Sequence, residues 1–317
     1  MSAATSHERR IAELIRETVG PCPVLLCGSR ALGTEIEGSD YDVVVVMPAV
    51  RIPRRVRAFP LLARRLEAEV GAPVSVNPLP ANRLGRETSL FAWKLRREAR
   101  VLAAPAGFSL AEAGPAPVTD ATAFSYLASA ALYLLAPLQA AALVDRSSSP
   151  QLQRSAHKCL LHVVQLRLLR RGAYAADLGA AVQALDDDRL RLLAVGTAMP
   201  EGLLGIRDAL LGDLEPLLAH RVSDAVVPNA RYAALSALRG RLRLRQALAA
   251  EPVDRALARA AAALLRAVAV DTAPDRTWTQ RAVAALPTGL LTRRASWDDI
   301  RAVVLTEWPD AHPLGAL

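Results

Sequence analysis

The chain is poor in cysteine and in aromatic residues. Its three cysteines, Cys22, Cys27 and Cys159, form neither a disulfide framework nor a zinc-binding spacing. Aromatic residues make up only 4% of the 317 positions, so packing must come mainly from aliphatic helix surfaces. The N-terminal residues MSAATSHERR lack the apolar stretch of a signal peptide, and we therefore expect a cytoplasmic protein.

Long uninterrupted apolar stretches are also missing. The most apolar segment, residues 121–144, is interrupted by Thr122, Ser125, Ser129, Pro137 and Gln139. No cluster of basic residues marks one flank of this segment, as the positive-inside rule would require for an oriented span. We therefore expect a buried helix there and no membrane partner.

Lysine is the scarcest of the charged residues. Only Lys94 and Lys158 are lysines among 39 basic residues, and the formal net charge is +8. That charge is compatible with a nucleotide, an acidic substrate or RNA, and it selects none of them. The arginines are spread over most of the predicted helices, and no RNA-binding module is recognisable, so a small-molecule partner is favoured over a nucleic acid.

The hydrophobic pattern predicts an α/β domain followed by an all-α domain. In the first part, helical spacing covers residues 7–19, 54–70 and 89–102, and strand-like runs cover 23–27, 40–47 and 73–79. A short strand at 101–102 can end the third helical segment. Later helices are predicted near 120–144, 150–171, 176–194, 203–219, 229–249, 252–270, 276–286 and 296–307. The expected domains are 1–103 and 120–317, with a Pro/Gly-rich linker at 104–119 and a nucleotide cleft completed by the helical domain.

The stretch CGSRALGTEIEGSDYDVVVV carries the chemistry. Gly28 lets the backbone turn sharply and approach a phosphate, and Ser29 offers a hydroxyl and an amide at the start of a helical turn. Asp40 and Asp42 lie two apart on the next strand, so both carboxylates emerge on one face. Their spacing, about 6.5–7 Å between Cα atoms, suits oxygen ligation of magnesium.

This stretch resembles the signature of the polymerase-β-type nucleotidyltransferase superfamily. That group includes aminoglycoside and lincosamide nucleotidyltransferases, minimal nucleotidyltransferases, poly(A)- and CCA-adding enzymes and DNA polymerase beta. The resemblance covers about eighty residues, up to Leu102. It implies a mixed-sheet core in which Gly28 and Ser29 hold a triphosphate. It also implies that Asp40 and Asp42 bind one or two magnesium ions, for which manganese can substitute.

The expected activity is magnesium-dependent transfer of a nucleoside monophosphate from a triphosphate such as ATP to a hydroxyl of a small molecule. The family usually carries a third carboxylate on the next strand, but here that position falls on Ser75 or Asn77. Glu87 lies just beyond and is a less favoured substitute. Two alternatives therefore stay open, namely an inert or weakly active nucleotide-binding module and an enzyme that adds nucleotides to RNA.

Two basic residues are further candidates for phosphate binding. Arg30 follows the Gly-Ser pair, where it either adds positive charge or faces solvent. Arg154, Lys158, His162 and Gln165 form a polar stripe on a helix whose opposite face is apolar. In related enzymes a helix of the second domain often supplies a lysine to the triphosphate, and Lys158 fits that role. The alternative is an ordinary solvated face.

Overall fold

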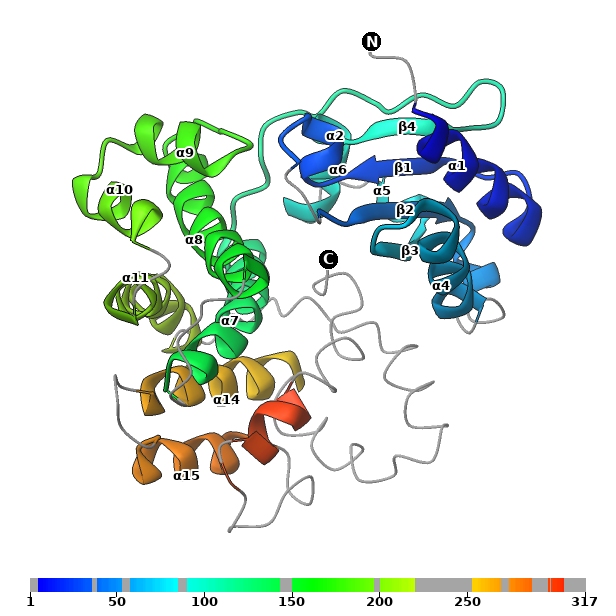
Figure 1. The fold of residues 1–317 in the computed structure, drawn as a ribbon. Helices are drawn as coiled ribbons and strands as arrows, with labels where there is room; N and C mark the ends of the chain where they lie inside the picture. The colour runs from blue at the N-terminus through cyan, green and yellow to red at the C-terminus, as the bar shows by residue number, and fades with distance from the viewer. Residues whose placement is uncertain are drawn as a thin grey trace. The chain divides into compact units, whose positions relative to one another are not determined.

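The computed structural model describes residues 5–35, 39–52, 58–84, 90–142, 150–196, 200–219, 253–268, 274–286, 296 and 298–304. The chain divides into two compact units, one ending at Pro117 and one beginning at Val118 (Figure 1). The division falls inside the linker expected at 104–119. The first unit is a mixed sheet with helices and the second is helical, which confirms the predicted fold class.

The N-terminal unit contains one four-stranded sheet and short helices. Its elements are α1 (Ser6–Val19), β1 (Val24–Cys27), α2 (Ser29–Leu32), β2 (Tyr41–Met47), the 3-10 helix η1 (Ala49–Arg51), α4 (Ala58–Val70), β3 (Val74–Pro80), α5 (Ala81–Leu84), α6 (Leu90–Glu98) and β4 (Arg100–Ala103). The strand order is β3-β2-β1-β4. β1 pairs antiparallel with both β2 and β4, whereas β2 and β3 are parallel.

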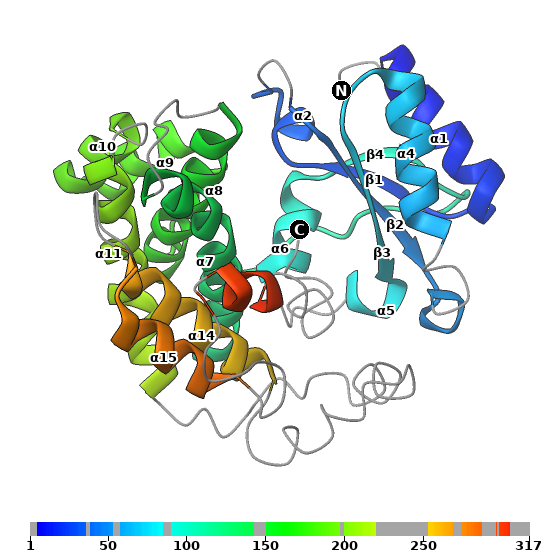
Figure 2. The same ribbon diagram turned by 60° about the horizontal axis from the view of Figure 1, so that its bottom comes forward.

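One face of the sheet is mainly apolar. Tyr41, Val43, Val45 and Met47 alternate along β2 and join a buried cluster with α1 and α4. In Figure 2, α1 and α4 lie together on one side of the strands, and α5 and α6 lie on the other. Because successive side chains of a strand point to opposite faces, Asp42 lies on the face away from the α1/α4 cluster.

The C-terminal unit is built from helices around a central pair. The bounds are α7 (Asp120–Ala142), α8 (Pro150–Arg170), α9 (Leu178–Leu185), α10 (Asp188–Val195), α11 (Pro200–Ala219), α14 (Val253–Ala267) and α15 (Arg276–Ala285), and residues 298–304 are also helical. α7 packs against α8, α11 and α14. Among the described residues, no helix is long and apolar enough to cross a membrane.

The structure of this unit differs from the sequence prediction at one helix. The single helix predicted near 176–194 is wrong, because the chain breaks between α9 and α10. Asp186 adopts a left-handed conformation with φ 54°, and the Asp187 side chain caps α10 by accepting from the Leu190 amide at 3.1 Å. Short acidic residues suit such a break, since they cap helices better than they propagate them. The helix predicted near 229–249 lies outside the described residues.

Candidate active site

The turn between β1 and α2 can be made only by glycine. Gly28 has φ +71° and ψ −159°, a region that essentially only glycine occupies, and a Cβ built on it would lie 2.7 Å from Oδ2 of Asp42. The Asp42 carboxylate is therefore in contact with the backbone at the end of β1. The sequence predicted close backbone approach at Gly28, but it did not predict which side chain fills the space.

Ser29 begins a single helical turn. The carbonyl of Gly28 accepts from the amides of Ala31 and Leu32, at 3.1 and 3.3 Å, and the Thr34 amide donates to the Ser29 carbonyl at 2.9 Å. These bonds fix the turn and leave the amides of Ser29 and Arg30 at its start, where helical amides have no partner within the helix. The helical turn predicted after Gly28 is therefore present, and phosphate binding by Ser29 stays a prediction.

Arg30 connects this turn to the strand that carries the aspartates. Its Nε and Nη2 donate to the Ser39 carbonyl at 3.1 and 2.7 Å. Its guanidinium also lies 3.8 Å from the centre of the Tyr41 ring. The side chain thus holds the residues on both sides of Asp40, a role that sequence reasoning missed. Phosphate binding by Arg30 stays a prediction.

Asp40 and Asp42 occupy the start of β2. Asp42 pairs with Cys27, and Asp40 directly precedes the strand; both side chains are partly exposed. The Cys27 thiol donates to the Asp42 carbonyl at 3.2 Å. The pKa of this thiol is raised, first by burial and then by the negative charges of Asp42 and Glu98. Cys27 is thus a structural neighbour of the site and unsuited to act as a nucleophile.

Ser75 takes the position next to Asp42 on β3. The two residues are register partners, and the Ser75 hydroxyl donates to Oδ1 of Asp42 at 2.9 Å. Asn77, two residues further, donates through Nδ2 to the Ser75 hydroxyl at 3.3 Å. The Ser75 hydroxyl therefore orients the Asp42 carboxylate. Glu87 lies outside the described residues.

The residues present fit a magnesium ion better than a transition metal. Among the described residues, no group of three or more histidine, cysteine or acidic side chains is arranged to hold a metal. Magnesium keeps several water ligands and is commonly held by one or two carboxylates together with substrate phosphates. Asp40 and Asp42 can supply those carboxylates.

The polar stripe on α8 is exposed at one end and buried at the other. Lys158 is exposed, and its Nζ lies 5.8 Å from the centre of the Tyr133 ring. Nδ1 of His162 donates to the Lys158 carbonyl at 2.7 Å, and the centre of its ring lies 4.4 Å from that of the Tyr126 ring. A contact of Lys158 with a triphosphate stays a prediction.

Gln165 does not belong to a solvent-facing stripe. It is fully buried, accepts from the Tyr126 hydroxyl and donates to the Ala175 carbonyl at 2.8 Å. Helical spacing placed Gln165 correctly in line with Lys158, but it could not show that α7 covers this end of α8. The placement of Gln165 on a solvated face is therefore wrong.

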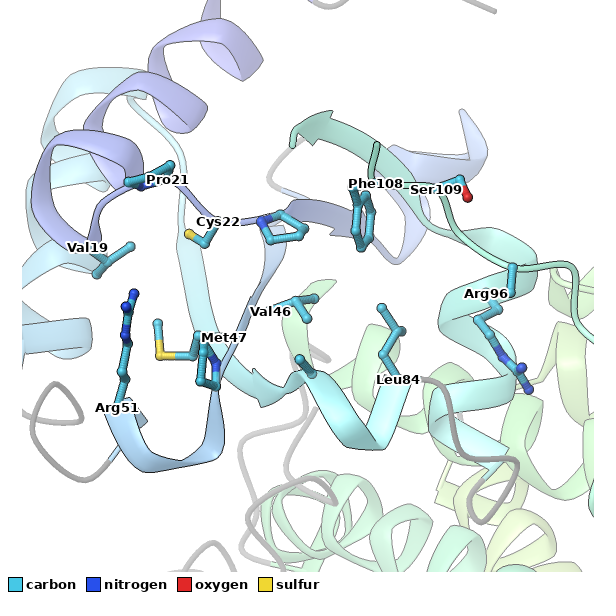
Figure 3. Close-up of a pocket in the computed structure, with 14 residues that line it drawn as sticks. Val19, Pro21, Cys22, Val46, Met47, Arg51, Leu84, Arg96, Phe108 and Ser109 are labelled. Atoms are coloured by element: carbon cyan, nitrogen blue, oxygen red, sulfur yellow. The ribbon is translucent and has the colours of Figure 1, made fainter. Parts of the chain in front are cut away.

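A pocket of about 350 Å³ opens at the other end of the sheet (Figure 3). It is lined by Val19, Pro21, Cys22, Pro23, Val46, Met47, Pro48, Arg51, Ala81, Leu84, Arg96, Phe108, Ser109 and Ala111. Figure 3 shows Phe108 and Leu84 approaching the space from opposite sides, with Arg51 at its edge. Five strand steps separate Asp42 from Met47, about 17 Å, so this pocket is distinct from the aspartate site. None of the predicted site residues lines it.

Comparisons with known proteins do not identify a family for this chain. No protein-family model, no curated protein and no solved structure matches the chain. The function must therefore be argued from the residues at the end of β1 and the start of β2.

Proposed function

We propose that the N-terminal unit binds a nucleoside triphosphate with magnesium and transfers its nucleoside monophosphate to a hydroxyl of a small molecule. One observation carries the proposal: Gly28 turns the chain directly against the carboxylate of Asp42, so a phosphate-binding turn and a metal-binding side chain meet at one point. A structural role alone does not require an aspartate against a glycine turn at the end of a buried strand.

Each group has a defined task in this proposal. The amide and hydroxyl of Ser29 bind phosphate oxygens, and Gly28 removes the side chain that would block them. Asp40 and Asp42 hold the metal, with Asp42 oriented by the Ser75 hydroxyl. Bound magnesium would neutralise the triphosphate and increase the electrophilicity of its α-phosphorus.

The experiment is a turnover assay on the full chain with each α-labelled nucleoside triphosphate. Hydroxylated small molecules and RNA are offered separately as acceptors, and released pyrophosphate and labelled product are measured with magnesium and with EDTA. We expect magnesium-dependent labelling of a small molecule. Labelling of RNA alone would assign the other acceptor class, and the absence of pyrophosphate release with every acceptor would contradict the proposed reaction.

A second candidate function is a nucleotide-binding module without chemistry. It is favoured by Ser75, which places a hydroxyl where related enzymes carry a third carboxylate. Calorimetry separates the two candidates, since the module binds magnesium and triphosphate without releasing pyrophosphate. Loss of binding in Asp42→Asn would then show that the same site is used.

A further inference from the structure

The backbone on both sides of Asp40 is held by hydrogen bonds. The Ser39 carbonyl, which lies in the same peptide plane as the Asp40 amide, accepts from Nε and Nη2 of Arg30 at 3.1 and 2.7 Å. The Tyr41 amide, which lies in the same plane as the Asp40 carbonyl, donates to the Pro73 carbonyl at 2.8 Å. Because peptide planes are rigid, fixing both of them sets the direction in which the Asp40 side chain leaves the backbone.

Arg30 makes these contacts from the side of the sheet that faces α1. Its guanidinium lies 3.8 Å from the centre of the Tyr41 ring. Tyr41 is buried and belongs to the apolar cluster with α1 and α4, whereas Asp42 follows it on β2 and lies on the opposite face. The guanidinium therefore supports the start of β2 from the face away from the Asp42 carboxylate.

The positive charge of Arg30 is partly balanced by a buried acid of α1. Glu8 is 4% exposed and accepts from both Nη atoms of Arg100, at 2.9 Å for Nη1. Burial opposes ionisation of Glu8, but the hydrogen bonds and charge of Arg100, with a smaller effect of the charge of Arg30, hold its pKa below the usual value. The Glu8 carboxylate thus attracts Arg30 towards the α1 side, which favours its position over the Tyr41 ring.

This arrangement depends on the shape of an arginine as well as on its charge. A planar guanidinium can place two N–H groups on one carbonyl while it stacks on a ring, whereas a lysine ammonium is a point charge on a flexible stem. Phosphate, in contrast, is bound by lysine as well as by arginine. The two N–H groups that Arg30 directs at the Ser39 carbonyl cannot be directed at a triphosphate at the same time, so the geometry favours a role in positioning.

We propose that Arg30 is a positioning residue, which sets the Asp40 carboxylate for metal binding by fixing the backbone before it. The inference rests on the proposed function, in which Asp40 and Asp42 hold magnesium. Residues that orient metal ligands typically contribute about 10- to 100-fold to metal affinity. Arg30 thus acts on the metal through Asp40, and the phosphate contacts come from the turn at Ser29.

The test compares Arg30→Lys with Arg30→Gln in the full chain. Manganese affinity is measured by electron paramagnetic resonance, and triphosphate affinity by calorimetry in EDTA. Both variants should weaken manganese binding by about 10-fold or more, because neither can reproduce the paired contact with the Ser39 carbonyl. The triphosphate affinity of Arg30→Lys in EDTA should equal that of the wild type. Saturating magnesium should restore most of kcat, since both aspartates are intact. Arg9→Lys, on the exposed side of α1, is the matched control and should change nothing.

Tyr41 provides a second test that leaves Arg30 in place. Tyr41→Phe keeps a ring beside the guanidinium and should keep the wild-type manganese affinity. Tyr41→Leu removes the ring and should weaken manganese binding by about two- to fivefold, the usual effect of a lost cation–π contact. Thermal unfolding of every variant in EDTA measures stability separately. A purely structural role would lower the melting temperature without changing the affinity for manganese.

The possible results distinguish the inference from the proposed function. Wild-type manganese affinity in a folded Arg30→Lys variant would overturn the inference and leave the proposed function standing. Loss of triphosphate affinity in Arg30→Gln, with recovery in Arg30→Lys, would make Arg30 a phosphate ligand and also overturn the inference. If both Arg30 variants fail to fold, equal manganese affinities of Tyr41→Phe and Tyr41→Leu would overturn it. Absence of manganese and triphosphate binding in the wild type would overturn the proposed function itself, and the inference with it.

Discussion

The two ends of the N-terminal sheet differ in chemistry although the same strands form both. At one end, Gly28, Asp42 and Ser75 bring a tight turn, a carboxylate and a hydroxyl into contact. At the other end, Val46 and Leu84 line an open but largely apolar pocket. The pocket and the group of polar residues are thus separate sites, about 17 Å apart along β2.

We call the end of the sheet with Gly28, Asp42 and Ser75 the polar end, and the end with the pocket the apolar end. The strongest test of this contrast removes a charge at the polar end. Asp42→Asn deletes a metal ligand with almost no change in volume, so turnover should fall by about 1,000-fold, since metal ligation supplies several kcal/mol to the transition state. Stability should change by less than about 1 kcal/mol. Asp188→Asn, whose carboxylate is almost fully exposed on α10, is the control. Wild-type turnover in Asp42→Asn would contradict the assignment of Asp42 as a metal ligand.

Two glycines with positive φ but different surroundings give the next comparison. Gly28 and Gly33 have φ +71° and +69°, but only at Gly28 would a Cβ meet another atom, Oδ2 of Asp42. Gly33→Ala should cost about 1–2 kcal/mol of stability, because Gly33 is in the left-handed conformation with ψ 27°. Gly28→Ala should cost at least as much, about 1–3 kcal/mol, because ψ −159° places Gly28 in a region that essentially only glycine occupies. Gly28→Ala should in addition lower turnover by about 100-fold, because it displaces the carboxylate. An equal change of turnover in Gly28→Ala and Gly33→Ala would show that the approach of Asp42 to Gly28 does not matter for the reaction.

Ser75→Asp sharpens the contrast by adding charge to the polar end. The new carboxylate would lie next to Oδ1 of Asp42, which Ser75 contacts at 2.9 Å. Without magnesium, repulsion between the two acids should lower stability by about 1–2 kcal/mol, and magnesium should restore it by bridging them. Thermal unfolding with EDTA and with magnesium measures both effects. Ser75→Asn, which adds no charge, should show no such dependence on magnesium.

The smallest effect is expected at the apolar end. Leu84→Phe enlarges a side chain that faces the pocket, so turnover should stay within about twofold and stability should hardly change. The same change at Leu79, which is 1% exposed and does not line this pocket, should cost about 1–3 kcal/mol through overpacking. Loss of turnover in a stable Leu84→Phe variant would show that the pocket end takes part in the reaction.

Local patterns predicted the elements of the polar end. The apolar runs of β1 and β2 and the glycine between them follow from short-range rules of burial and turn formation. The position of Ser75 beside Asp42 also agrees with its place on the next strand. These features depend on residues that are neighbours in the sequence or on adjacent strands.

Features that depend on distant pairing could not be predicted. Glu8 of α1 and Arg100 of β4 are 92 residues apart in the sequence, and only the fold brings them together, with Nη1 of Arg100 donating to Oε2 of Glu8 at 2.9 Å. The buried state of Gln165 likewise depends on Tyr126 of another helix. The pocket could not be predicted from the sequence, because the aliphatic residues that line it cannot be told from ordinary core residues by their pattern.

The parallel pairing of β2 with β3 has an evolutionary consequence. Val74 and Val76 hold β3 in register through the apolar cluster, whereas Ser75 points to the other face. A mutation at position 75 can therefore exchange serine for an acid or an amide without disturbing the residues that specify the fold. Descendants of one ancestral sheet could in this way gain or lose a metal ligand in a single step, and their chemistry could diverge while their architecture is inherited unchanged.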